Sequence, residues 1–177
     1  MKFNRISVGA VKAQDPRFRD IPKEPGVYRW WFPRGLAEKL LKPLAGVKIN
    51  LISKEIIDGK EYWCLYFGIA KDLRQRVRWH ACQKHSPSAV KHGFLSTLRQ
   101  SISALLGLDQ TMSADDVSDV LEQCYWDWSP TATKEEAEAI EKKRLSIEYF
   151  PINIQGNKSV DPAVIKQLTE LRKKYKK

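Results

Sequence analysis

The chain has 177 residues, which is enough for a single domain with a substantial hydrophobic core. Its 31 lysine and arginine residues outnumber its 21 aspartate and glutamate residues, and the resulting formal charge of +10 favours a polyanionic partner. No apolar run approaches the ~20 residues of a membrane-spanning helix, and three cysteines at spacings unlike a disulfide framework, with no signal peptide before them, predict a soluble protein of the reducing cytoplasm.

We expect one domain over residues 1–177, with a core at 25–155 and extensions at 1–24 and 156–177. The first extension carries scattered charge and prolines, which predicts an irregular lead-in or an added edge of a sheet.

The first regular elements follow this extension. Residues 26–32 are too apolar for a strand with one solvated face, so they predict a central strand with Trp30 and Trp31 on opposite faces. The leucine spacing over residues 35–44 predicts a short helix that ends at Gly46.

A hairpin comes next. Residues 47–57 and 60–69 flank the dipeptide Asp58-Gly59, which favours a two-residue type I′ turn. The run Cys64–Ile69 on the return strand is short, apolar and rich in aromatic residues, as in a buried strand.

After the hairpin, the sequence predicts a helix that carries an arginine side chain in a defined orientation. Asp72 can cap the helix, and Leu73 and Val77 recur at core spacing. Arg76 and His80 are four residues apart, so their side chains project from the same side. The guanidinium suits phosphate oxygens, and the imidazole can relay a proton near neutral pH.

Two further helices and a strand are predicted downstream. Residues 94–106 form an amphipathic pattern that ends at Gly107, and Ser113 can cap a helix that runs through Leu121. Residues 124–128 predict the last main strand.

The chain ends in two predicted helices. Thr133 and Glu136 have the spacing of a capping box for a helix over residues 134–149. A final helix over residues 161–175 runs into a lysine-rich tail, which we interpret as a solvated helix end that adds nonspecific attraction to nucleic acid.

The helix over residues 134–149 has an apolar stripe that consists of Ala137, Ile140, Leu145 and Ile147. Two carboxylates fall inside this stripe: Glu148, near the helix end, where exposure is easier, and Glu141, in the helix interior. A carboxylate in such a place needs a cation, either from a structural ion pair with Arg144 or Lys142 or from a hard divalent ion such as Mg²⁺ or Mn²⁺.

Five elements together resemble the GIY-YIG nuclease superfamily. They are Gly26-Val27-Tyr28, Tyr66-Phe67-Gly68, Arg76 ten residues after Tyr66, Glu141, and Asn153 twelve residues after Glu141. The resemblance implies an α/β (α+β) fold with a small, mostly antiparallel central sheet flanked by helices. An inserted helix and an extra strand account for the long separation between the two triplets.

The resemblance also implies roles for residues. Tyr28 would hold or deprotonate the attacking water with His80 as its helper, and Tyr66 would support the water or the phosphate. Arg76 would stabilise the transition state, and Glu141 would hold the single Mg²⁺ or Mn²⁺ ion. The residues implied in structural or backbone support are Gly26, Gly68 and Asn153. The residues expected to bind substrate are Lys71, Arg74 and Arg78.

The sequence therefore predicts a metal-dependent endonuclease that acts on DNA, with RNA left open. Basic residues dominate positions 71–99, which agrees with a nucleic-acid partner. Many family members carry a lysine where this chain has Ile69, although Lys71 follows two positions later. The alternative is a binding module of the same fold that does not cut and that uses basic charge with the tryptophans Trp30, Trp31, Trp63 and Trp126.

Two further interpretations are weaker. Five acidic residues and no basic residue lie within 109–122, a segment that could dock a basic protein partner. His80, Cys82 and His85 cluster in the sequence as zinc ligands do, but a fourth ligand close in the sequence is missing.

Overall fold

The computed structural model describes residues 1–10 and 16–176, so parts of both predicted extensions, residues 11–15 and 177, lie outside the described residues. Its centre is a five-stranded sheet in the order β1-β5-β2-β4-β3, and every pairing in it is antiparallel. The strands are β1 (Asn4–Ser7), β2 (Gly26–Pro33), β3 (Lys54–Ile57), β4 (Lys60–Ala70) and β5 (Tyr125–Pro130). The predicted α+β class and the central place of β2 are thereby confirmed.

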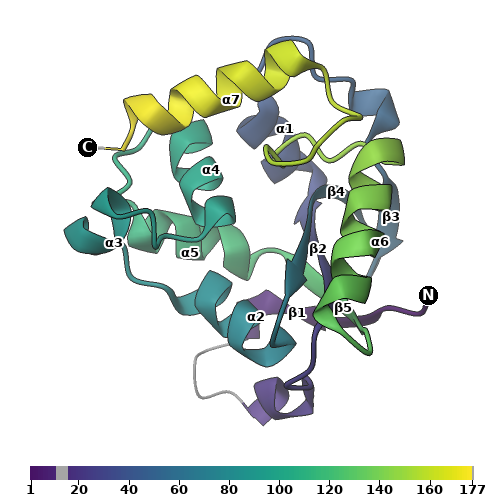
Figure 1. Cartoon of the computed structure of the whole chain (residues 1–177). Helices are drawn as coiled ribbons and strands as arrows, with labels where there is room; N and C mark the ends of the chain where they lie inside the picture. Colours follow the sequence, from purple (N-terminus) through teal and green to yellow (C-terminus); the bar gives the residue numbers. More distant parts are fainter. Residues whose placement is uncertain (11–15, 177) are drawn as a thin grey trace.

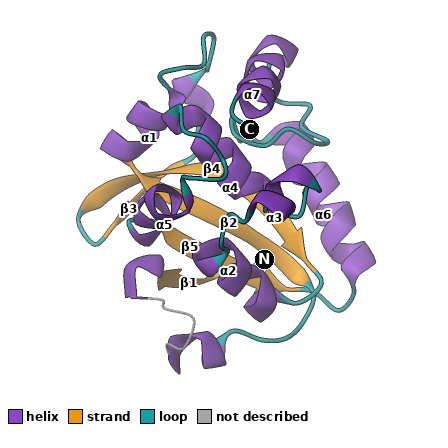
Figure 2. Ribbon diagram, turned by 90° about the vertical axis from the view of Figure 1, so that its left-hand side faces the viewer, coloured by secondary structure: helices purple, strands orange, loops and turns teal. Residues whose placement is uncertain are grey.

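Helices cover both faces of this sheet. Figure 1 shows α6 on one side of the strands and α2, α4 and α5 on the other, and Figure 2 looks onto the sheet through the latter group. The helices are α1 (Arg34–Leu41), α2 (Leu73–Cys82), α3 (Pro87–Lys91), α4 (Thr97–Leu106), α5 (Ala114–Glu122), α6 (Lys134–Ile147) and α7 (Pro162–Lys174). No helix in the described part of the chain has the length and apolar character needed to cross a membrane.

The alternation of β2 builds two hydrophobic cores. Trp30 packs with residues of α1, α2, α4 and α5, whereas Trp31 packs with Ala137 and Leu145 of α6. A β-bulge lies between the two tryptophans. The prediction that they occupy opposite faces is confirmed.

The predicted hairpin is correct at its turn and wrong in its first strand. Asp58 and Gly59 both have positive φ, 49° and 75°, as a type I′ turn requires. Residues 47–53 do not form the predicted strand, and they contain a 3₁₀ turn at Ile49–Leu51. The strand β3 begins only at Lys54 and pairs with Lys60–Trp63.

Several element ends differ from the predictions. The helix predicted from residue 94 begins only after Ser96, whose hydroxyl accepts from the amide of Arg99, and α3 precedes it unpredicted. Helix α6 ends at Ile147 because Glu148 is extended, and the side chain of Ile147 is 65% exposed. Ile147 is therefore not part of the buried stripe.

The caps are correct in part. Asp72 accepts from the amide of Gln75 at the start of α2, as predicted. The hydroxyl of Ser113 donates to Ser103 instead of capping α5. In the predicted capping box Thr133 caps α6, but the carboxylate of Glu136 accepts from the amide of Ala132.

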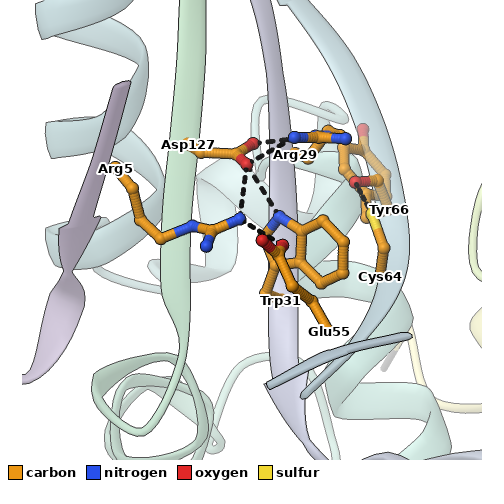
Figure 3. A network of polar contacts seen from close by, with 7 residues as sticks. All are labelled: Arg5, Arg29, Trp31, Glu55, Cys64, Tyr66 and Asp127. Carbon is orange, nitrogen blue, oxygen red and sulfur yellow. Dashed lines mark hydrogen bonds and ion pairs between the residues drawn. The ribbon is translucent and has the colours of Figure 1, made fainter. Parts of the chain in front are cut away.

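The α6 face of the sheet also carries a buried carboxylate, Asp127 of β5 (Figure 3). Arg29 donates to it twice, at 3.0 and 2.7 Å, and Trp31 donates through its indole nitrogen at 2.9 Å. Arg5 of β1 donates at 3.2 Å and also pairs with Glu55 of β3 at 2.6 Å. This Asp127 cluster therefore joins four of the five strands. It also secures β1, the added edge that was one of the two structures predicted for the first extension.

Candidate active site

The two glycine-tyrosine triplets lie side by side because β2 and β4 are paired, with Tyr28 opposite Gly68. A Cβ atom on Gly68 would lie 2.5 Å from the hydroxyl oxygen of Tyr28. A Cβ atom on Gly26 would lie 2.5 Å from the carbonyl oxygen of Ser129 on β5. Both positions therefore require the absence of a side chain.

A chain of hydrogen bonds starts at Tyr28. Its hydroxyl lies 2.9 Å from Nε2 of His80, and Nδ1 of His80 lies 2.9 Å from the hydroxyl of Ser96. A neutral His80 with its proton on Nδ1 donates to Ser96 and accepts from Tyr28, whereas the other tautomer accepts at Nδ1 and donates to Tyr28. The Ser96 hydroxyl also accepts from the amide of Arg99. Because a hydroxyl has two acceptor positions and one donor, Ser96 can bind the Arg99 amide and still accept from or donate to Nδ1 of His80.

Burial keeps both members of this pair neutral. It lowers the pKa of His80 well below its usual range, and the charges of Arg76 and Arg99 lower it further. Burial likewise raises the pKa of Tyr28 well above 10, against the opposing charge of Arg76. At neutral pH the pair is therefore an uncharged phenol and an uncharged imidazole.

Tyr66 lies beside this pair. Its ring stacks on that of Tyr28 with centroids 6.3 Å apart, and its hydroxyl is hydrogen-bonded to that of Thr97 at 2.9 Å. Burial raises the pKa of Tyr66, and the bond with Thr97 partly offsets this effect. Thr97 lies at the start of α4 and was not predicted as a site residue.

A cavity of about 630 Å³ brings four of the predicted catalytic side chains together. They are Tyr28 of β2, Tyr66 of β4, Arg76 of α2 and Glu141 of α6. His80 is buried and reaches the cavity only through Tyr28. We call this space the central cavity. Its other lining residues are Gly68, Ile69, Thr97, Glu138, Lys142, Leu145, Gln155, Gly156 and Lys158.

Glu141 is half-buried at the wall of the central cavity. Burial raises the pKa of its carboxyl, the charge of Glu138 raises it further, and the charge of Arg76 lowers it. The structural ion pair considered from the sequence does not form: within the described residues Glu141 has no ion pair, and Arg144 pairs with Glu148 instead. The carboxylate therefore faces the cavity with the charge of Arg76 nearby but without a direct ion pair within the described residues.

Arg76 is the matching cation. Its charge affects the pKa values of Tyr28, Tyr66, His80 and Glu141, so its guanidinium is within electrostatic range of all four. Across residues 1–10 and 16–176 it has no ion pair with a carboxylate. Its guanidinium carbon lies 5.2 Å from the ring centroid of Trp79, in a cation–π contact. A phosphate oxygen could therefore bind it without displacing a protein partner.

The donor set of the cavity fits a hard divalent cation. Glu138 and Glu141 both line it, and Mg²⁺ often takes only one or two carboxylates and completes its shell with water and substrate phosphate. The part of the chain that the structure describes has no group of three or more His, Cys, Asp or Glu side chains arranged for a metal. A cation at Glu141 would favour the ionised carboxylate, which burial and the charge of Glu138 disfavour.

Asn153 completes the edge of β4 where β3 has ended. Its side-chain oxygen accepts from the amide of Phe67 at 2.9 Å, and its side-chain nitrogen donates to the carbonyl of Phe67 at 2.7 Å. The amide side chain thus takes the place of a neighbouring strand beside Tyr66 and Gly68. This contact suits the structural role that the resemblance implies.

The three residues expected to bind substrate lie outside the central cavity. Arg74 donates to the carbonyls of Ile21 and Arg19, both at 2.6 Å. With Arg78 it lines a separate groove of about 680 Å³ along α2, and Lys71 is exposed in the turn before this helix. The lysines that do line the central cavity are Lys142 and Lys158, beside Ile69. Lys158 comes from a loop for which the sequence offers no signal.

Two other expectations need correction. Trp30, Trp31, Trp63 and Trp126 are all buried, so they are not available to stack on nucleic acid bases. The exposed tryptophan is Trp79, at 40%.

The residues of the zinc interpretation point to different partners. His85 bonds the carbonyl of Gln110 and receives a hydrogen bond from Arg99, while His80 bonds Tyr28 and Ser96. Arg99 itself is fully buried, and it also donates to the carbonyls of His80 and Ala114 and to the hydroxyl of Ser118. This cluster joins α2, α4 and α5.

Comparison with known proteins agrees with this geometry. A family model described as the GIY-YIG catalytic domain matches residues 26–174, from the first residue of β2 to the last residue of α7. No curated protein and no solved structure matches the chain significantly.

Proposed function

The chain belongs to the GIY-YIG catalytic-domain family, and from this premise we propose that it is a metal-dependent endonuclease that hydrolyses phosphodiester bonds in DNA. The observation that carries the proposal is the central cavity, where Tyr28, Arg76 and Glu141 come from three separate elements. Phosphodiester hydrolysis needs an activated water, a cation for the phosphate oxygens and stabilisation of the departing alkoxide. The cavity supplies groups for each requirement.

Arg76 binds the scissile phosphate in this proposal. A guanidinium is permanently charged and presents a planar fork to phosphate oxygens, and it stabilises the additional negative charge of the pentavalent transition state. Lys142 and Lys158 add positive charge to the same cavity. A Mg²⁺ or Mn²⁺ ion bound by Glu141, with Glu138 beside it, would act as a Lewis acid on the phosphate and the departing oxygen.

Tyr28 and His80 pass the proton of the attacking water. The phenol oxygen takes a proton from the water as its own proton moves to Nε2 of His80, which is 2.9 Å away. The charge of Arg76 contributes to the low pKa of His80. A phosphate dianion or diester bound at Arg76 offsets this charge, so substrate binding raises the proton affinity of the imidazole when it is needed.

The basic character of the chain supports a nucleic-acid substrate. Arg78 and Trp79 line the groove along α2, the helix that also carries Arg76, and the net charge is +10. We propose that this groove and Lys71 contact the substrate backbone, which makes binding depend strongly on salt concentration.

The test is nicking of supercoiled plasmid with and without Mg²⁺. Glu141→Ala and Tyr28→Phe should each reduce the rate by about 10²–10³-fold, since each removes a group that acts at the reacting phosphate or water. Glu135→Ala is the matched control, because Glu135 is an exposed acid on the same helix that does not line the cavity. Nicking that survives both cavity substitutions would refute the proposed site.

A binding module that does not cut is the second candidate. Ile69 lines the central cavity at the position where many members of the superfamily carry a lysine. This candidate predicts salt-dependent binding to DNA that needs no metal and no cleavage of plasmid, duplex, flapped or single-stranded substrates. The same plasmid assay, run beside a binding titration, separates the two.

A further inference from the structure

A second cavity adjoins the central one. It has a volume of about 280 Å³ and shares Tyr66, Thr97, Glu141 and Gln155 with the central cavity. It is also lined by Arg172 of α7, which directly precedes the lysine-rich tail and was not predicted as a site residue. We propose that this second cavity binds the substrate phosphate next to the one that is cleaved, with Arg172 as its cation. The proposal rests on the proposed function and adds a subsite to it.

The side chain of Arg172 is half-buried and lacks a carboxylate partner within the described residues. Its one side-chain hydrogen bond goes to the neutral amide oxygen of Gln100. Arg99, whose guanidinium is fully buried, donates to four different acceptors and serves to join helices. Arg172 instead keeps donors that can serve a ligand.

Arg172 is also held in place. The side chain of Gln110 donates to its main-chain carbonyl at 3.0 Å, and α7 packs along α4. Its guanidinium is close enough to Tyr66 to affect the pKa of that phenol. These contacts fix the backbone of Arg172, and the hydrogen bond to Gln100 restrains its guanidinium, so an anion binds with less loss of side-chain entropy.

The remaining lining residues suit a phosphate. Thr97 and Ser101 lie one turn apart on α4, so both hydroxyls face the same side, and Gln155 adds an amide donor. The volume has room for a phosphate group but not for a base pair. Glu141 lies at the boundary, and its negative charge favours an anion nearer to Arg172.

The second cavity is next to the cleavage site, and this points to one strand of nucleic acid as the ligand. Ligands in two cavities that share four lining residues are direct neighbours. Consecutive phosphates of one strand meet this requirement with a single molecule. The phosphate can be an internal diester or the terminal phosphate of a cut strand, and the two sources call for different substrates in the test.

The experiment is a scan of neutral methylphosphonate linkages through a DNA strand that the protein cleaves. One linkage next to the cut should lower kcat/KM of the wild-type protein by about 10–100-fold. Arg172→Gln should lower kcat/KM on unmodified DNA by a similar factor and should lose its sensitivity to that one linkage, because the two changes remove the same contact. Effects that multiply would overturn the proposal.

Lys173→Gln is the matched control, since it removes one exposed charge from the adjacent residue. It should keep the full sensitivity to the methylphosphonate. Thermal unfolding of each variant checks the fold. If Arg172→Gln does not fold, the methylphosphonate scan of the wild-type protein tests the proposal alone. The proposal is then overturned if no linkage next to the cut is sensitive to neutralisation. Two further substrates begin at the neighbouring position, one with a 5′-phosphate and one with a 5′-hydroxyl. Comparing them shows whether the second cavity binds a terminal phosphate or an internal diester.

A binding titration without cleavage keeps the two proposals apart. In Ca²⁺, the affinity for the unmodified strand should fall by about 10-fold in Arg172→Gln, and the neutral linkage should have no further effect. If the wild-type protein cuts nothing but shows this pattern, the endonuclease proposal fails and the phosphate subsite stands. If the wild-type protein cuts but lacks the pattern, only the subsite fails.

Discussion

The Asp127 cluster and the central cavity both include residues of the central sheet, but their charged groups are partnered differently. Asp127 is fully buried and accepts from Arg29, Arg5 and Trp31, so each charge has a partner (Figure 3). In the central cavity, Arg76 and Glu141 face an open volume without ion pairs of their own within the described residues. The first arrangement holds strands together, whereas the second leaves its charges ready for a ligand. Their mutants should therefore fail in different assays.

The largest expected effect is the loss of stability in Asp127→Ala. The substitution leaves Arg29 and Arg5 without their shared carboxylate, and removal of one partner from a buried ion pair costs about 3–4 kcal/mol. Urea unfolding measures this loss, with the exposed Asp116→Ala as control at under about 0.5 kcal/mol. Cleavage per folded molecule should stay near the wild-type level. A selective loss of cleavage instead would place Asp127 among the residues of the active site.

The second prediction concerns Asn153→Ala, because Asn153 binds the edge of β4, the strand that carries Tyr66. It leaves the amide and carbonyl of Phe67 without partners and should lower the unfolding free energy by about 2–3 kcal/mol. Asn153→Asp keeps the acceptor and loses the donor, so it should fall between the wild type and the alanine variant. Equal unfolding midpoints for all three proteins would show that β4 does not need this contact.

The third prediction tests the close approach of the two triplets. Gly68→Ala places a methyl group against the hydroxyl of Tyr28 and should reduce cleavage by about 10–100-fold by moving this oxygen from His80. Gly35→Ala is the control, since nothing lies within 4 Å of its Cβ position. When Tyr28→Phe is already present, Gly68→Ala should cause little further loss. Independent losses would mean that the methyl group acts elsewhere.

The smallest expected effect is a gain of stability in Glu141→Gln. The folded state raises the pKa of Glu141, so its ionised form is disfavoured and its removal should stabilise the protein by a few tenths of a kcal/mol after solvent screening. The gain should vanish below the carboxyl pKa of the unfolded chain and reach its full size above the raised pKa of the folded state. Mg²⁺ should raise the Tm of the wild type but not of the variant. If Mg²⁺ leaves the Tm of both proteins unchanged, this result would argue against a metal at Glu141.

The sequence predicted what depends on local spacing. The 2- and 3.6-residue periods predicted a strand that carries Tyr66 and a capped helix that carries Arg76 and His80 on one side. The Asp58-Gly59 turn needed only its backbone preference. Each of these inferences uses interactions within a few residues, and each element was found where it was expected.

The sequence could not predict contacts that depend on tertiary packing. Tyr28 and His80 are bonded across 52 positions, a contact that the family resemblance implied but that local spacing could not give. Arg172 lines the second cavity because α7 packs on α4, and neither spacing nor resemblance indicated this. Ile147 fits the apolar stripe by period but is exposed because the helix ends there. The four tryptophans expected to bind nucleic acid are buried for the same reason, because composition does not determine which aromatic side chains stay exposed.

The central position of β2 also determines when the protein acquires its function. Its two neighbours in the sheet, β4 and β5, begin at Lys60 and Tyr125, and Glu141 follows on α6. Folds that depend on such distant pairings form slowly, because long loops must close before any contact compensates for them. During synthesis the ribosome therefore releases Tyr28 and Tyr66 well before Glu141, and the central cavity cannot be complete until α6 has emerged.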